Sequence, residues 1–113
     1  MPTSLQKLVI GDNFNNSVAK LPKSLIWIKF GFAFNKSVNK LPLNLETIIF
    51  GNSFNQTIDK LPNKIKHISF GKKFSKSLAN LPDSVLSIKF IESNIPNDIP
   101  NFVEEITFYI DEL

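Results

Sequence analysis

Apolar positions along this chain recur with a period of 20 residues. Prolines mark each cycle, at Pro2, Pro22, Pro42, Pro62, Pro82 and, after a shortened last cycle, Pro100. Three residues after each proline begins the pattern L-x-x-I-x-F-G-x-x-F-N-x-S-V-x-K-L-P, which residues 25–42 match at every position. A period of this length is typical of a solenoid, in which each repeat is one structural unit that stacks on the next.

Each cycle predicts one strand followed by one return arc. Residues 45–50 end in an alternation of β-branched and aromatic side chains, as a strand requires. Glycine then follows at Gly11, Gly31, Gly51 and Gly71, where we expect a backbone turn that a side chain would obstruct. An isolated unit cannot bury its apolar face, but units stacked about 4.8 Å apart join their faces into one core. We therefore predict a β-rich, parallel solenoid of about six coils.

Two phenylalanine columns are expected to run along that core. The first begins with Ile10 and continues through Phe30, Phe50, Phe70, Phe90 and Phe108. The second contains Phe14, Phe34, Phe54 and Phe74. Because aromatic side chains contribute large apolar areas to protein cores, we interpret both columns as packing and not as a ligand cage.

A polar column accompanies the second phenylalanine column, at Asn15, Asn35, Asn55 and Ser75. Polar groups in a buried turn need hydrogen-bond partners, and stacked amides can bond to the backbone of neighbouring coils. Hydroxyls two residues later can close the same turn, at Ser17, Ser37, Thr57 and Ser77. The three asparagines also match the N-x-[ST] glycosylation pattern. Their exact repeat spacing favours a structural role over glycan attachment.

The hexapeptide Phe-Gly-x-x-Phe-Asn stands at residues 30–35 and 50–55 and, with serine last, at residues 70–75. It is preceded by L-x-x-L-x-F and followed by Leu-Pro at constant spacing over four cycles. Over residues 2–108 the sequence therefore resembles the FNIP, or FGxxFN, repeats, a branch of the leucine-rich repeats found in social amoebae and giant viruses. The resemblance implies a leucine-rich-repeat-like curved coil with one parallel sheet on its concave face.

The resemblance also implies a role in protein interaction. Some viral members carry an amino-terminal F-box and are regarded as adaptors of ubiquitin ligases. We expect no such segment before Pro2, and the adaptor role is an alternative to the interaction module. The chain departs from the family in its shorter unit and in its fifth cycle, where Ile91 replaces glycine. We expect a single domain, with regular repeats at residues 1–91 and a shortened last repeat forming a C-terminal cap at residues 92–113.

Charge is divided unevenly along the chain. Thirteen lysines, and no arginine, lie at or before Lys89, where only four acids oppose them, and from Glu92 onward six acids have no basic partner. A column of lysines would meet at one solenoid edge, formed by Lys20, Lys40 and Lys60 with Lys72, Lys73 and Lys76 nearby. Such an edge is compatible with nucleic-acid binding. The absent arginines and the acidic end favour a solvated edge instead.

The chain has no cysteine, which excludes disulfides and thiolate chemistry and suits a reducing compartment. It shows neither a signal-peptide pattern nor an apolar run of eighteen residues. We expect a soluble protein that does not associate with membranes and lies in the cytoplasm, or in the host cytoplasm if the source is viral.

Function is expected on the strand positions that alternate with the core positions, because these side chains point away from the core. The concave surface predicted in this way comprises Lys7, Val9, Trp27, Lys29, Thr47, Ile49, His67 and Ser69. Trp27 with Val9 and Ile49 forms an apolar patch between two lysines, of the kind that anchors protein interfaces. An alternative is that Trp27 only covers the sheet beside its neighbours.

No chemistry-bearing constellation accompanies this surface. His67 is the only histidine, and no repeated carboxylate or second histidine is spaced to complete a catalytic triad or a metal site. The four glycines occur one per coil and form no phosphate-binding loop. We therefore expect no catalysis, no cofactor and no metal, and a protein as the partner.

The first coil suggests a second interface. Met1 already occupies the position before Pro2, so no amino-terminal cap is expected, and an open face would contain Leu5, Leu8, Ile10 and Phe14. Burial of this face against another chain would give a homodimer or a larger homo-oligomer, and the opposite charges of the two ends would favour head-to-tail contacts. A purely structural, self-assembling protein without a separate ligand is the alternative to a module that binds a different protein.

Overall fold

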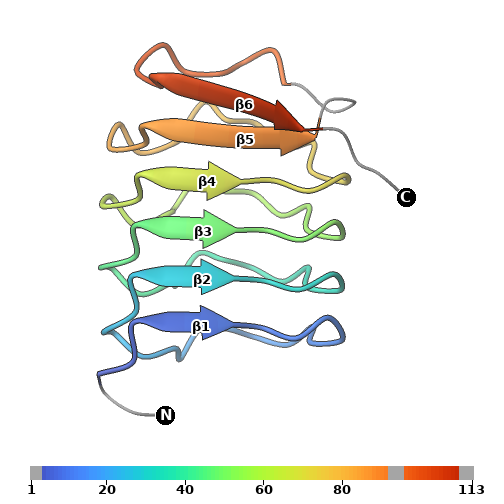
Figure 1. The fold of residues 1–113 in the computed structure, drawn as a ribbon, viewed down its shortest axis with the longest axis vertical. Helices are drawn as coiled ribbons and strands as arrows, with labels where there is room; N and C mark the ends of the chain where they lie inside the picture. Colours follow the sequence, from blue (N-terminus) through green and yellow to red (C-terminus); the bar gives the residue numbers. More distant parts are fainter. Residues whose placement is uncertain (1–3, 92–95, 110–113) are drawn as a thin grey trace.

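The computed structural model describes residues 4–91 and 96–109, and it forms a β-solenoid with one parallel sheet (Figure 1). The six strands follow one another in the sheet in chain order. Their bounds are β1 Lys7–Val9, β2 Trp27–Lys29, β3 Thr47–Ile49, β4 His67–Ser69, β5 Ser87–Ile91 and β6 Glu105–Tyr109. The predicted fold class is confirmed.

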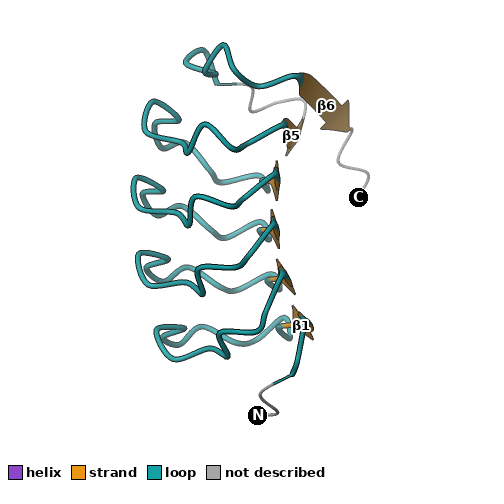
Figure 2. Cartoon of the chain, turned by 90° about the vertical axis from the view of Figure 1, so that its left-hand side faces the viewer, coloured by secondary structure: helices purple, strands orange, loops and turns teal. Residues whose placement is uncertain are grey.

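The register of the sheet repeats the sequence period. Leu8 pairs with Ile28, and each later pair up to β5 joins residues 20 apart. The last pair, Ile88 with Ile106, spans only 18 residues, so the two missing residues shorten the return arc and leave the strand register unchanged. Figure 2 shows the strands on one side and the return arcs fanning out on the other, which places the sheet on the inner, concave side of the stack.

Two columns of stacked phenylalanine rings run through the core beside its leucine, isoleucine and valine side chains. Within the first column the ring centroids of Phe30 and Phe50 lie 5.6 Å apart, and within the second those of Phe34 and Phe54 lie 6.1 Å apart. The two columns also contact each other, at 4.1 Å between Phe30 and Phe34. These four side chains are buried. Ring stacking of this kind adds to the stabilisation from area burial and fixes one coil directly above the next.

Two rows of side-chain oxygens connect the turns of successive coils. Asn15 Oδ1 accepts a hydrogen bond from the backbone N–H of Asn35 at 2.8 Å, and Asn35 Oδ1 accepts one from Asn55 at 2.8 Å. Asn55 Oδ1 in turn accepts from the N–H of Ser75 at 2.9 Å. In the second row, Asp12 Oδ1 accepts a hydrogen bond from the backbone N–H of Phe32 at 3.2 Å. The first row occupies the oxygens of all three sequon asparagines.

The glycine column has a steric cause. None of the four glycines, all within the described residues, has a positive φ, so the turn itself does not require glycine. A Cβ on Gly31 would instead lie 2.5 Å from the carbonyl oxygen of Gly11, and a Cβ on Gly51 would collide with that of Gly31. A Cβ on Gly11 would meet nothing within 4 Å. Glycine is therefore required where one coil rests on the backbone of the coil before it.

The last two strands are longer than the others because the glycine column ends before them. Ile91 and Tyr109 occupy the positions that follow the first phenylalanine column, and they extend the pairing of β5 with β6 to five residues. The Tyr109 hydroxyl donates a hydrogen bond to the carbonyl oxygen of Phe70 at 3.1 Å. This bond ties the end of β6 to a coil two turns earlier.

The described part of the shortened last repeat covers β5 but leaves its own core positions exposed. Ile99, Phe102 and Val103 pack against the core, and Phe90 and Ile91 beneath them are buried. Ile106 is 41% exposed and Phe108 is 45% exposed. Residues 92–95 and 110–113 of the predicted cap lie outside the described residues, so the cap as a whole stays a prediction.

The steric origin of the glycine column can be tested with two alanine substitutions. Gly51→Ala should destabilise the protein by about 1–3 kcal/mol, because its Cβ forces two coils apart. Gly11→Ala is the matched control, for which we expect no loss of stability. Urea unfolding of both variants measures the difference, and equal stabilities would contradict the coil-contact explanation.

The asparagine row can be tested at its centre. Asn35→Ala removes the acceptor of the Asn55 N–H, and also of the Gln56 amide at 3.1 Å, so we expect a loss of about 1–2 kcal/mol in unfolding free energy. Asn39→Ala, at an exposed position in the same arc, is the control. Equal thermal stabilities of the two variants would show that the row does not hold the coils together.

Candidate interaction surface

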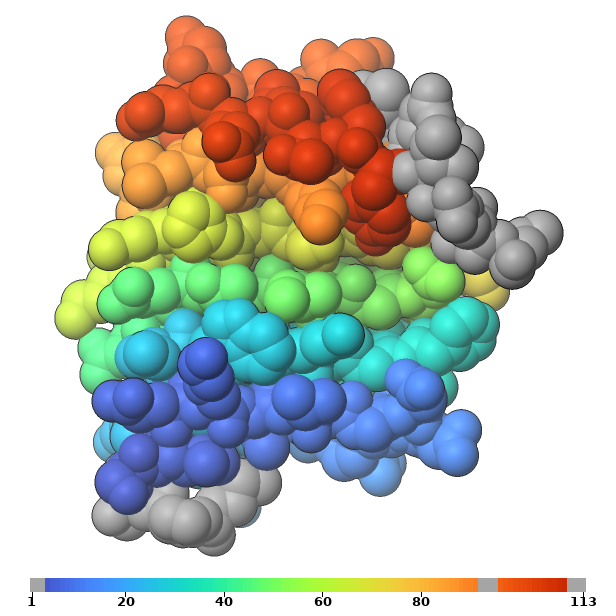
Figure 3. Space-filling model, in the orientation of Figure 1, coloured from blue at the N-terminus to red at the C-terminus, as the bar shows by residue number. Residues whose placement is uncertain are grey.

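The outward side chains of the six strands form two parallel columns on the concave side of the sheet, here called the sheet face. In order from β1 to β6, one column is Lys7, Trp27, Thr47, His67, Ser87 and Glu105, and the other is Val9, Lys29, Ile49, Ser69, Lys89 and Thr107. Figure 3 shows this face, with β1 at the blue end and β6 at the red end. All eight residues of the predicted concave surface lie on it.

The half of the sheet face nearest β1 carries the predicted apolar patch, formed by Val9, Trp27 and Ile49. Val9 is its most exposed member at 66%, while Trp27 and Ile49 are partly buried. The ammonium of Lys7 lies 5.8 Å from the Trp27 ring centroid, a cation–π distance. The patch therefore combines apolar area with two lysines, Lys7 beside Trp27 and Lys29 between Val9 and Ile49.

The half nearest β6 is polar. A shallow hollow of about 290 Å³ lies over β3 to β6, and its polar lining residues are Thr47, His67, Ser69, Ser87, Lys89, Glu105 and Thr107. His67 Nδ1 lies 2.6 Å from Ser87 Oγ. The ammonium of Lys89 lies 5.2 Å from the Tyr109 ring centroid. Burial raises the pKa of the Tyr109 phenol above its ordinary value, against the lowering effect of a hydrogen bond to the Ser69 side chain.

Among the described residues, this polar half shows neither a completed catalytic triad nor a cluster of metal ligands. The His67–Ser87 contact has no third group that orients the far nitrogen of the imidazole ring among the residues that the structure describes. Within residues 4–91 and 96–109, no three histidine, cysteine or acidic side chains converge as a metal site needs. The hollow presents a set of hydrogen-bonding side chains.

A groove at the carboxyl ends of β1 to β3, here called the Phe32 groove, was not predicted. It encloses about 410 Å³, and the residues that line it include Val9, Gly11, Asp12, Lys29, Gly31, Phe32, Gly51 and Asn52. Phe32 is 57% exposed although it lies in the second of six coils. The sequence holds a signal for it, since the equivalent residues Asp12, Asn52 and Lys72 are all polar.

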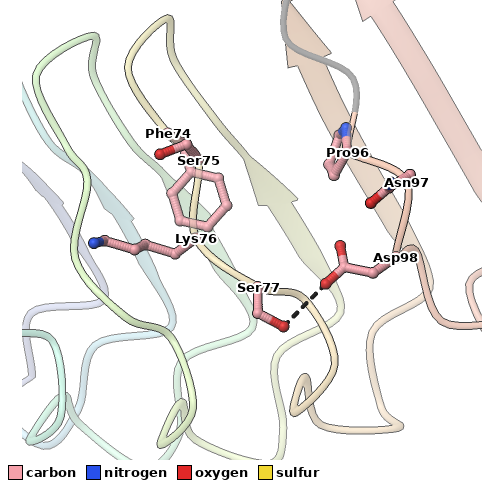
Figure 4. A pocket seen from close by; sticks show the side chains of 7 residues that line it. All are labelled: Phe74, Ser75, Lys76, Ser77, Pro96, Asn97 and Asp98. Atoms are coloured by element: carbon pink, nitrogen blue, oxygen red, sulfur yellow. Dashed lines mark hydrogen bonds between the residues drawn. The ribbon is translucent and has the colours of Figure 1, made fainter.

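A larger notch, of about 510 Å³, lies where the last return arc is shortened (Figure 4). It is lined by Phe74, Ser75, Lys76, Ser77, Pro96, Asn97 and Asp98. The Asp98 carboxylate points at Ser77, accepting hydrogen bonds from its hydroxyl at 2.9 Å and from the N–H of Leu78 at 3.0 Å. The Asp98 carboxylate is therefore engaged in hydrogen bonds that join two coils.

The residues of the predicted self-association end lie on the first coil, and all four are partly buried and pack against the core: Leu5, Leu8, Ile10 and Phe14. Phe14 contributes the first ring of its column, 6.4 Å from Phe34. At the other end of the stack, Ile106 and Phe108 occupy the columns of Leu8 and Ile10. Both ends thus present the same core columns.

The described segments contain no helix that is long and apolar enough to cross a membrane. The family described as FNIP Repeat matches residues 1–33, 34–73 and 54–93. A solved structure, that of the giant-virus protein CroV588, described as a novel circular leucine-rich-repeat protein, matches 96% of this chain at 37% identity and a TM-score of 0.82. The chain spans 18% of the length of that protein. No curated protein matches.

Proposed function

The chain belongs to the FNIP repeat family of leucine-rich-repeat proteins, and from this premise we propose that it is a non-catalytic module whose sheet face binds another protein. One observation carries the proposal. The core columns repeat the same residue types from coil to coil, whereas the residue type on the sheet face changes at nearly every step. Because the coils are otherwise equivalent, packing alone does not account for this variation.

The chemistry of the sheet face suggests the chemistry of its partner. Lys7, Lys29 and Lys89 are opposed there by one acid, Glu105, so an acidic partner surface is favoured. Val9, Trp27 and Ile49 surround Lys29, which pairs with both Val9 and Ile49 in the sheet, and they offer an anchor for an apolar side chain. We place the module in the cytoplasm, a reducing compartment that suits a chain without cysteine.

The double variant Trp27→Ala/Ile49→Ala tests the proposal. We expect it to lose capture of the partner by about tenfold or more, because the apolar anchor is removed, with only a small change in melting temperature. The measurement is quantitative pull-down from an extract of the cells that express the protein. Leu43→Ala, at a site 74% exposed outside the sheet face, is the matched control. Equal capture by the double variant and the control would remove the patch as the binding site.

A second candidate function is self-association by stacking of one chain on another. It is supported by the exposure of Ile106 and Phe108 on β6, which is an edge strand of the sheet and pairs with β5 alone among the described strands. If β6 paired with β1 of a second copy in the register of the other strands, Glu105 would lie beside Lys7 and Ile106 beside Leu8. The circular arrangement described for CroV588 is consistent with coils of this kind meeting end to end.

The charged variant Leu8→Glu tests this second candidate. It places a carboxylate in the core column opposite Ile106, so we expect the oligomer to dissociate in sedimentation measurements, whereas Leu43→Glu should leave it intact. Lys7→Glu should weaken the oligomer without touching the core, and Glu105→Lys in the same chain should restore it. A wild-type mass that stays monomeric at all concentrations and salt levels would exclude the stacking.

A further inference from the structure

Phe32 interrupts a structural row of the solenoid. In the coil before it, Asp12 Oδ1 accepts a hydrogen bond from the N–H of Phe32, and in the coil after it, Asn52 Oδ1 accepts one from the N–H of Lys72, each at 3.2 Å. A phenyl ring has no oxygen, so the N–H of Asn52 lacks the side-chain acceptor that its two counterparts have. The row of side-chain acceptors is therefore broken at position 32, between Asp12 and Asn52.

No packing gain replaces that bond in the core. Phe32 is not a member of either buried phenylalanine column, and none of the ring stacks among the described residues includes it. Its exposure is also not caused by an end of the stack, because coils lie on both sides of it. A large aromatic side chain held at the surface in this way is typical of an interface residue.

The shape of the Phe32 groove follows from the coil contacts. Its floor includes the backbone of Gly11, Gly31 and Gly51, the last two of which cannot carry a Cβ without meeting the carbonyl oxygen of the preceding coil. The hollow beside the ring is therefore a fixed feature of the stacked backbone. Val9 lines it with Phe32, so two exposed apolar side chains share one groove.

We propose that the Phe32 groove binds an apolar side chain from an extended, acidic segment of the partner protein that occupies the sheet face. This inference rests on the proposed function and extends it. Val9 and Lys29 belong both to the sheet face and to the groove, so a segment lying on the first two strands continues into the groove without a break. Asp12 and Lys29 both line the groove, so the acidic residue of the segment is expected beside Lys29 on the sheet face, next to the apolar residue in the groove.

The absence of a side-chain acceptor for the Asn52 N–H also favours this complex. Asn52 lines the groove, and its N–H is free of the acceptor that a polar residue at position 32 would provide. A backbone carbonyl of the bound segment can accept from that N–H, as main-chain atoms do when an extended peptide lies along a protein edge. The exposed ring and an amide without a side-chain acceptor thus suit the same ligand, an extended peptide with an apolar side chain.

The test is selection of random phage-displayed peptides on the immobilised full chain, followed by affinity measurements with the enriched peptides. We expect these peptides to share an apolar residue beside an acidic one. They should bind Phe32→Asn about tenfold or more weakly, bind Phe32→Leu within about threefold, and bind the control Leu43→Asn as they bind the wild type. Phe32→Asn restores an oxygen to the row, so its melting temperature should stay within about 4 °C of the wild type.

Several results would overturn the inference. Enriched peptides without an apolar residue, or with undiminished affinity for Phe32→Asn, would exclude the groove as their site. Affinity lost only in the Trp27→Ala/Ile49→Ala variant would leave the sheet face as the site and reject the groove. Dissociation of a wild-type dimer by Phe32→Asn would show that a second copy fills the groove instead. Should Phe32→Asn fail to fold, Phe32→Ser tests the same position with a smaller polar side chain, and the same loss of affinity is expected.

Discussion

Direct contact between the backbones of successive coils is the constraint on which the rest of this structure depends. Gly31 and Gly51 leave no room for a Cβ beside the carbonyl oxygen of the coil before them, and this close approach brings the phenylalanine rings into stacking distance. The same approach lets Asn35 Oδ1 reach the N–H of Asn55. Backbone, ring and amide contacts therefore require the same in-register stacking, which is why the sequence repeats so closely over 20 residues.

A scaffold held in this way separates structural from functional positions. The inward strand positions, such as Ile28 and Ile48, must match their neighbours, whereas the outward positions contact solvent and can differ from coil to coil. The sheet face uses this freedom to place an apolar, lysine-rimmed patch next to a polar hollow. Phe32 extends the same principle beyond the strands, at a position where the row of oxygens would otherwise continue. Variation among equivalent positions thus identifies the candidate binding surface.

Much of this architecture could be predicted from the sequence, because residues one repeat apart lie next to each other in adjacent coils. The strand register, the two phenylalanine columns and the membership of the sheet face all follow from residues 20 apart, such as Leu8 and Ile28. The exposure of Phe32 was not predicted, although the polar residues at the equivalent positions, Asp12, Asn52 and Lys72, hold the signal for it. The steric cause of the glycine column and the longer pairing of Ile91 with Tyr109 depend on distances between coils, which a single repeat does not reveal.

The central claim concerns equivalent positions in successive coils. Positions that keep the same residue type stabilise the fold, whereas outward positions whose residue type varies bind the partner. Its most direct test is a scan of all single substitutions with two readouts on the same library, protease resistance for folding and peptide or partner capture for binding. The account predicts that changes in the core columns lower both signals, and that changes lowering capture alone cluster on the sheet face and the Phe32 groove. Capture-only positions that cluster on the convex return arcs instead would contradict it.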